Sequence, residues 1–244
     1  MFLLRYAVAS LALLIAFVST AFAAPLVITA CTTLSTPGSY VLGNNLSAAG
    51  DCIVIAADFV TVDLDGFVIT GLKPGSGITA IRGGRGTVVR NGTITGFTNG
   101  ILLDKAVDVV VERVNAFSNS NIGIDLGDGA VVRNSRAEQN GNNGMSLGQR
   151  ALVTGSTANE NGNAGIFAQV GANIVGNLVG RNKGTGIMAV DGANVVNNMS
   201  RNNGLAGIYV DCPGAVIANT SGTNLGGNLV LNGGACIADH NSTL

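Results

Sequence analysis

Two carboxylates in the first half of the chain are the best candidates for acid–base chemistry. In the strand repeat described below, Asp104 and Asp125 become diagonal neighbours on adjacent strands. Diagonal neighbours lie roughly 7–8 Å apart, and cleavage of a glycosidic bond uses two carboxyl groups about 5–9.5 Å apart. With Asp128, the pair could instead hold Ca²⁺, which prefers oxygen ligands. The plainer interpretation is three solvated surface carboxylates balanced by Lys105.

A row of apolar residues in the second half is the candidate binding surface. Phe167, Met188 and Tyr209 recur at one constant interval, and Asp211 follows Tyr209 closely. Such a row could form a platform for a sugar ring or a partner, or it could simply be packing between neighbouring strands. Asp191, Tyr209 and Asp211 form a second polar group, for which solvated carboxylates are again the plainer interpretation.

Other catalytic arrangements are missing from the sequence. The single histidine, His240, falls in a segment predicted to be a solvated tail. No Ser-His-Asp set, Cys-His set, phosphate loop or metal-ligand cluster is present, so we predict no cofactor beyond the calcium alternative. The repeat arginines are expected at turns, away from the candidate face, and they are Arg133, Arg136, Arg181 and Arg201. Whether the protein is an enzyme stays open at this level.

A recurring sequence motif, a glycine followed by a large apolar residue, sets the positions of these candidates in the repeat. From Gly123 onward the glycine recurs at positions 123, 144, 165, 186 and 207, a constant interval of 21. The first and third residues after the glycine are apolar, as in a strand with one buried face. The interval is too short for a βαβ unit of about 30 residues or a propeller blade of about 40. The motif occurs at Gly77-Ile78, Gly100-Ile101, Gly123-Ile124, Gly144-Met145, Gly165-Ile166, Gly186-Ile187 and Gly207-Ile208.

This interval predicts an all-β solenoid. The architecture that fits is a parallel β-helix whose coils have two or three strands joined by tight Gly and Asn turns.

An asparagine column supports the stacking of these coils. If each coil lies about 4.8 Å above the last, like residues sit over one another and their amides can hydrogen-bond along the column. Because buried amides are costly when unpaired, we predict an inward asparagine ladder at a bend of the coil. Its members are Asn119, Asn140, Asn161, Asn182, Asn203 and Asn224.

The segments around the repeats have separate predicted roles. Residues 24–75 do not follow the repeat and are expected to form short entry strands and to cap the first coil, because an array needs an atypical terminal unit. Residues 76–235 form the repeats, and residues 236–244 form a C-terminal tail.

The N-terminus and the cysteines indicate export. Residues 1–23 combine Arg5, a short apolar run and Ala21-Phe22-Ala23, which predicts a cleaved signal peptide and a secreted or periplasmic protein with no membrane anchor after cleavage. Four cysteines allow three disulfide connectivities. Their clustering favours Cys31–Cys52 and Cys212–Cys236, each closing a short loop.

Composition argues against a polyanionic partner. The chain has 244 residues, 11% charged residues and a formal net charge of −1. A nucleic-acid-binding protein would show a basic patch or stripe, so no nucleic-acid partner is expected.

The Gly-Ile, Val-Val and Asn columns resemble the right-handed parallel β-helix proteins of the pectin-lyase-like superfamily, and residues 52–71 resemble the N-terminal entry of its secreted bacterial members. The resemblance implies that any substrate crosses the outward face of the first strand of each coil. The paired-Asp, Gly-His-Gly and Asp-Pro-His motifs of the family's enzymes are missing. We therefore expect binding of an extracellular or cell-surface polysaccharide. A polysaccharide-processing enzyme using Asp104 and Asp125 is the first alternative, and a structural or adhesive surface protein is the second.

Overall fold

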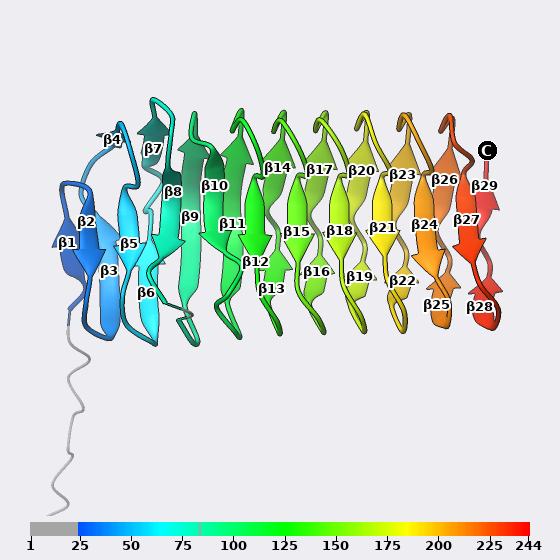
Figure 1. Ribbon diagram of the computed structural model, residues 1–244, viewed down its shortest axis with the longest axis horizontal. Helices are drawn as coiled ribbons and strands as arrows, with labels where there is room; N and C mark the ends of the chain where they lie inside the picture. The colour runs from blue at the N-terminus through cyan, green and yellow to red at the C-terminus, as the bar shows by residue number, and fades with distance from the viewer. Residues whose placement is uncertain (1–23, 83) are drawn as a thin grey trace, which may run out of the picture.

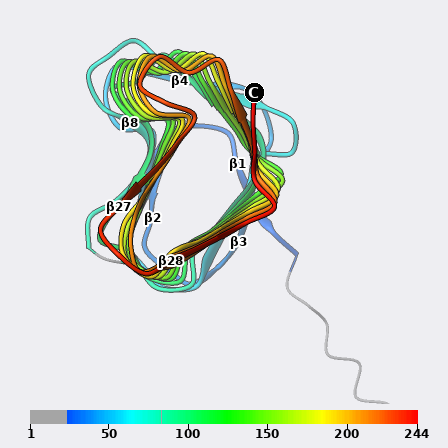
Figure 2. The ribbon, with the colours of Figure 1, turned by 90° about the vertical axis from the view of Figure 1, so that its right-hand side faces the viewer.

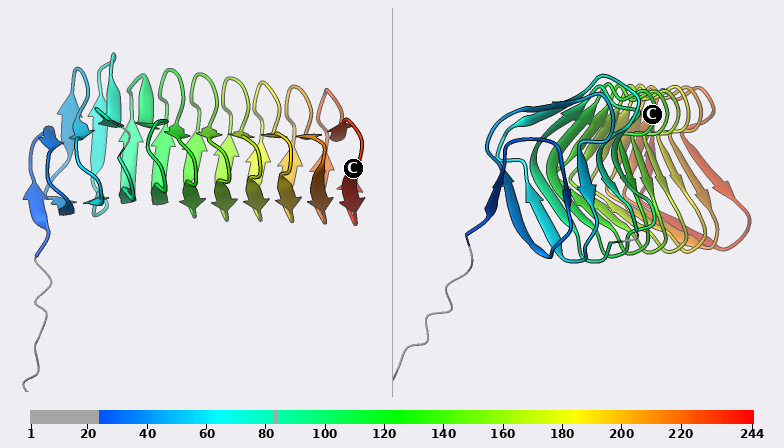
Figure 3. Two further views of the ribbon diagram at one scale, coloured as in Figure 1. Left: turned by 60° about the horizontal axis from the view of Figure 1, so that its bottom comes forward. Right: turned by 60° about the vertical axis from the view of Figure 1, so that its left-hand side comes forward.

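The computed structural model describes residues 24–82 and 84–244, in which the chain winds into a solenoid of short strands (Figure 1). Viewed along the solenoid, the coils superimpose around one continuous core (Figure 2), and their turns stack in rows (Figure 3). The predicted signal peptide lies outside the described residues. Within the described residues, no helix is long and apolar enough to cross a membrane.

Two parallel sheets form the walls of the solenoid. The ten-stranded sheet contains one strand from each coil, and these are β2 (Thr32–Leu34), β5 (Ile53–Ile55), β8 (Ser76–Ala80), β10 (Asn99–Leu103), β12 (Ile124–Leu126), β15 (Met145–Leu147), β18 (Ile166–Ala168), β21 (Ile187–Ala189), β24 (Ile208–Asp211) and β27 (Leu229–Asn232). The nineteen-stranded sheet contains β1 (Leu26–Ile28), β3 (Gly38–Leu42), β4 (Leu46–Ala48), β6 (Val60–Asp63), β7 (Val68–Gly71), β9 (Val88–Thr95), β11 (Val110–Phe117), β13 (Val131–Arg133), β14 (Arg136–Glu138), β16 (Leu152–Thr154), β17 (Thr157–Asn159), β19 (Asn173–Val175), β20 (Leu178–Gly180), β22 (Asn194–Val196), β23 (Met199–Arg201), β25 (Gly214–Ile217), β26 (Thr220–Gly222), β28 (Cys236–Asp239) and β29 (Ser242–Thr243).

The Gly-Ile motif marks where each coil enters the ten-stranded sheet, as predicted. Ile124 pairs with Met145 and Met145 with Ile166, and all three side chains are fully buried. The glycine before them is required by close packing: a Cβ at Gly165 would overlap the side chains of Val179 and Asn182. The repeat interval therefore corresponds to one coil of a parallel β-solenoid.

Strands at both ends of the described chain continue the two sheets. The segment expected to carry the cap and entry strands supplies β2 and β5 to the ten-stranded sheet, with Ile53 paired to Ile78. The spacing between these two residues exceeds the repeat interval because β6 and β7 have four residues each rather than three, and because β8 begins two residues before Ile78. A search at the repeat interval therefore misses these coils. The segment expected to be a tail supplies β28 and β29, which pair with β25 and β26. The first and last described coils therefore continue the same parallel pairing.

One corner of each coil is a single residue in the left-handed backbone region. Gln139, Glu160 and Arg181 have φ of 56°, 57° and 54°, which is uncommon for residues other than glycine. Each is followed directly by an asparagine of the ladder. The expectation that Gly and Asn make the turns is thus only partly right, because the hydrogen bonds of the following asparagine hold this corner whatever side chain it carries.

The predicted asparagine ladder is confirmed. Asn140 Nδ2 donates to Asn161 Oδ1 at 3.1 Å, and Asn161 Nδ2 donates to Asn182 Oδ1 at 2.9 Å. Each of these side-chain oxygens also accepts the backbone N–H of the coil before it. The ladder continues through Asn203 to Asn224, so the buried amides are paired rather than orphaned.

A second ladder at another bend was not predicted. Asn177 Nδ2 donates to Asn198 Oδ1 at 3.0 Å, Asn198 to Asn219 at 3.0 Å, and Asn219 to Asn241 at 3.0 Å. Ser135 and Ser156 precede them in the same column and accept backbone N–H groups. The signal was present as a small polar residue once per repeat, although it changes from serine to asparagine along the chain.

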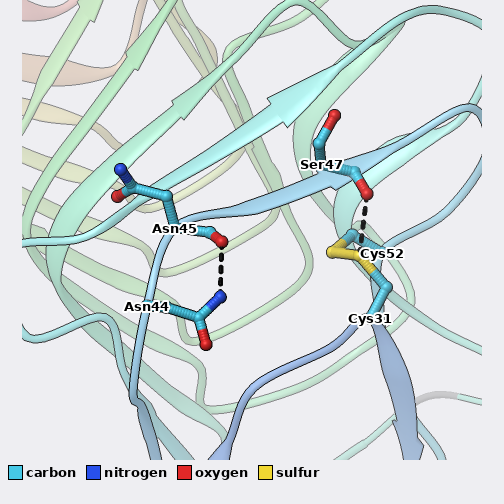
Figure 4. The surroundings of a disulfide bond; sticks show 5 residues. All are labelled: Cys31, Asn44, Asn45, Ser47 and Cys52. Atoms are coloured by element: carbon cyan, nitrogen blue, oxygen red, sulfur yellow. Dashed lines mark hydrogen bonds between the residues drawn. A yellow bond between two sulfur atoms is a disulfide. The ribbon is translucent and has the colours of Figure 1, made fainter.

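Both favoured disulfides are present, one near each end of the described solenoid. Cys31 joins Cys52 across the coils of β2 and β5 (Figure 4). Cys212, directly after β24, joins Cys236 in β28. Each bond therefore ties a terminal coil to its neighbour.

Candidate functional site

The outward face of the ten-stranded sheet carries one side chain per coil in a continuous line, which we call the outer row. Strand pairing places its members directly opposite one another. The row therefore brings the candidate carboxylate and the candidate apolar platform onto one surface, separated by a single coil. From β8 onward its members in order are Thr79, Leu102, Asp125, Ser146, Phe167, Met188, Tyr209 and Val230.

An open cavity of about 600 Å³ follows the second half of this row, and we call it the apolar groove. The outer-row residues from Phe167 to Val230 form one side, and the turns leading into the strands form the other. The full lining is Asn143, Asn163, Ala164, Phe167, Thr185, Met188, Leu205, Ala206, Tyr209, Gly226 and Val230. The structure thus gathers Phe167, Met188 and Tyr209, the three apolar residues singled out in the sequence, into one cavity.

The groove lies where the residue before each repeat glycine is small. Beside most of the groove that residue is Ala164, Thr185 or Ala206, with Asn143 at the N-terminal end of the groove, whereas in the coil before Asn143 it is Ile122. Leu205 stands at the rim with 55% of its surface exposed. Sequence reasoning missed these turn residues because they precede the strand, although their column was visible at the same repeat interval.

Asp211 holds the tyrosine at the C-terminal part of the groove. The Tyr209 hydroxyl donates to Asp211 Oδ1 at 3.0 Å, and Asn232 Nδ2 donates to the same oxygen at 2.7 Å. This hydrogen bond to the carboxylate raises the pKa of the Tyr209 hydroxyl. Asp211 is therefore occupied in positioning Tyr209, whereas the tyrosine ring lines the groove.

Asp125 lies in the outer row two strands before the groove. Its backbone partner is Leu102, so Asp104 is its diagonal neighbour, as expected. Burial of the half-buried carboxyl group, reinforced by the negative charge of Asp104, raises the pKa of Asp125 to about 6, while the neighbouring Ser146 hydroxyl acts in the opposite direction. The two carboxyl groups share one face, and Asp104 is the exposed member.

The calcium alternative finds no matching geometry. Among residues 24–82 and 84–244, no group of three or more His, Cys, Asp or Glu side chains is arranged to hold a metal ion. Asp128 instead accepts the backbone N–H of Gln149 at 2.8 Å. Asp128 therefore serves the turn after the strand through this hydrogen bond.

The remaining predicted polar residues lie off this face. Arg133, Arg136 and Arg201 lie within strands of the nineteen-stranded sheet, so their placement at turns was wrong, while Arg181 does occupy a corner. His240 is exposed between β28 and β29, and its Nδ1 lies 2.8 Å from Asp239 Oδ2. None of these five residues lines the apolar groove.

Comparison with known proteins identifies the architecture. The family profile described as a right handed beta helix region matches residues 31–173, more than half of the chain. The A-module of the Azotobacter vinelandii mannuronan C-5 epimerase AlgE4 superimposes with a TM-score of 0.60 and 18% identity, covering 80% of this chain and 72% of the module. The periplasmic alginate epimerase AlgG gives a TM-score of 0.58 and 15% identity, covering 87% and 64%.

The Dettilon tailspike protein gives a TM-score of 0.64 and 16% identity, covering 90% of this chain and 54% of the tailspike. No curated protein gives a significant sequence match. At these identities the solved structures establish the fold alone. With the profile match and the parallel solenoid both established, the chain belongs to the family of right-handed β-helix proteins.

Proposed function

We propose that this protein binds an extracellular or cell-surface polysaccharide along the outward face of the ten-stranded sheet, with the apolar groove as the main contact. The observation that carries the proposal is the row of Phe167, Met188 and Tyr209, repeated once per coil in an open cavity. Ligand sites are concave and mostly apolar with a few placed polar groups. A groove with one contact per coil suits a polymer, which offers the same unit repeatedly.

The comparisons support the general class of ligand. Two of the similar structures are alginate epimerases, named for action on a polysaccharide. The two disulfides and the periplasmic origin of one neighbour fit an extracellular or periplasmic location, where such polymers occur. We therefore propose a secreted or periplasmic glycan-binding protein.

The test is a matched pair of methionine variants. Met188→Ala removes the central contact of the groove, whereas Met199→Ala removes a methionine that is 40% exposed on the nineteen-stranded sheet. Binding to neutral and acidic polysaccharides is measured by affinity gel electrophoresis. We expect the wild-type protein to be retarded by at least one polymer, Met188→Ala to bind roughly tenfold more weakly, and Met199→Ala to match wild type. Equal binding by both variants, or no retardation by any polymer, would contradict the proposal.

A second candidate function rests on the raised pKa of Asp125. A carboxyl group protonated up to about pH 6 can donate a proton to the leaving oxygen of a glycosidic bond, while Asp104 activates water from the other side of the bond. Two carboxyl groups whose environments differ are the arrangement that such hydrolysis uses. Polysaccharide processing therefore stays as the alternative.

Its test is the pH dependence of cleavage. If protonated Asp125 is the acid, release of reducing ends is expected to be highest below the Asp125 pKa of about 6 and to fall as pH rises through it. Asp125→Asn is expected to abolish the cleavage. Asp104→Asn removes the proposed base and one cause of the raised pKa, so the Asp125 titration, followed by NMR, shifts downward. Unchanged cleavage by Asp125→Asn would remove Asp125 from any catalytic role.

A further inference from the structure

We infer that the apolar groove takes a neutral polysaccharide, whose sugar units carry neither carboxylate nor sulfate, rather than a polyanionic chain. This inference rests on the proposed function and names the chemical class of its ligand. None of the eleven groove-lining residues is Asp, Glu, Lys, Arg or His. Recognition there must therefore use apolar area and neutral hydrogen-bonding groups.

Both kinds of group are present and suit a neutral sugar chain. Phe167, Met188 and Tyr209 present an apolar surface to the C–H faces of sugar rings. Asn163 and Thr185 line the same cavity, where Asn163 is exposed and Thr185 is partly exposed. Amide and hydroxyl groups can both donate to and accept from sugar hydroxyls. The polar groups of the groove suit the hydroxyl groups of a pyranose ring, and its apolar surface suits the C–H faces of the ring.

The ionisable groups flanking the groove have the wrong sign for an anionic chain. Asp211 lies beside Tyr209, and Asp125 lies along the outer row in the N-terminal direction. A uronate chain passing over this face would bring carboxylates toward these acids. It would also give up water from its own charges with no cation to replace it, which is costly.

Two basic residues of the turns beside the groove belong to a different cleft. Arg181 and Lys183 line a separate cleft together with Asn202 and Thr223, and neither lines the apolar groove. Arg181 is moreover paired with Glu160 at 2.8 Å. Neither of these two cations is therefore part of the lining that would contact the proposed ligand.

A pair of probes that differ only in charge tests the inference. β-1,4-Linked mannohexaose and the hexamer of β-1,4-linked mannuronate share ring configuration and linkage, and differ only in whether C6 is a hydroxymethyl or a carboxylate. A second pair is an oligogalacturonate and its carboxyl-reduced form. We expect the neutral member of at least one pair to bind about tenfold or more tightly than its acidic member, because each carboxylate must be desolvated without a partner. Neutral binding should also be insensitive to salt.

A charge placed in the groove should reverse the preference. Met188→Lys puts an ammonium group at the centre of the groove, whereas Met199→Lys puts one on the nineteen-stranded sheet. We expect Met188→Lys to weaken binding of the neutral hexamer about tenfold and to make binding of the acidic hexamer detectable and sensitive to salt. Met199→Lys should leave both affinities at the wild-type level, which controls for net charge.

The possible failures are distinguishable. If the wild-type protein binds the acidic member of each pair as tightly as the neutral member, or more tightly, the inference is overturned while glycan binding stands. If it binds no member of either pair and no polymer in the wider panel, the proposed function falls together with the inference. If Met188→Lys leaves the preference unchanged, the ligand does not occupy the groove and the inference fails on that ground.

Discussion

Replacing Asn161 by leucine is expected to lower the free energy of unfolding by about 4 kcal/mol, because several buried polar groups lose their partners at once. Asn161 Nδ2 donates to Ala137 O at 3.0 Å and to Asn182 Oδ1 at 2.9 Å. Asn161 Oδ1 accepts the backbone N–H and the side-chain amide of Asn140, each at 3.1 Å. Leucine fills similar space but can make none of these four hydrogen bonds.

The matched control is Asn194→Leu, which removes an exposed asparagine from β22. Asn194 Nδ2 donates to Asn173 Oδ1 at the surface, so we expect a change within about 0.5 kcal/mol. Urea unfolding followed by circular dichroism measures both variants. If Asn161→Leu unfolds at the same urea concentration as wild type, the ladder does not contribute to stability. Unfolding of a solenoid spreads from coil to coil, so the midpoint and slope should be reported together.

Opening the Cys212–Cys236 disulfide should destabilise the last described coil by about 3 kcal/mol, the value expected for a loop of this length. The double variant Cys212→Ser with Cys236→Ser leaves β27, β28 and β29 paired on one side only, against the coil before them. Local opening should therefore concentrate there. Hydrogen exchange at the amides of β27 and β28 is the direct measurement, and it should accelerate while that of β12 and β15 is unchanged.

This variant also connects stability with the proposed binding. Val230 of β27 forms the C-terminal end of the apolar groove, so fraying of β27 should weaken polysaccharide binding. The matched control is Cys31→Ser with Cys52→Ser, which opens the other disulfide, in the coils of β2 and β5, at the opposite end of the solenoid from β27 (Figure 1). It should cost a similar amount of stability at the N-terminal coils and leave binding intact. If β27 exchanges no faster in the first variant, its disulfide is not what secures that coil.

The constant repeat interval was sufficient to predict the coil, because in a parallel solenoid residues one repeat apart are also neighbours in space. Ile124, Met145 and Ile166 stack in the core for that reason, and Asn140 meets Asn161 for the same reason. The outer row follows too, since alternate residues of a strand face opposite sides. Where the interval lengthens, between Ile53 and Ile78, this reasoning failed although the pairing persists.

For the candidate site, too, the repeat interval predicted which residues are neighbours but not their environment. The sequence placed Asp104 beside Asp125, and Phe167 beside Met188, because these are relations between corresponding strands of neighbouring coils. It did not show that Asp125 is half-buried with its pKa raised to about 6, since burial depends on surrounding side chains. Nor did it distinguish a flat row from a groove.

By itself, then, the sequence determined the coil, its stacking, the asparagine ladder and the residues of the outer row, because each depends on one repeating interval. Only the tertiary structure decided that Phe167, Met188 and Tyr209 line a cavity, because its opposite wall comes from turn residues such as Thr185 and Leu205. The depth of that cavity depends on how turn and strand fold against each other within a coil. No spacing along the chain encodes that angle, and it is settled only when the side chains of turn and strand pack together.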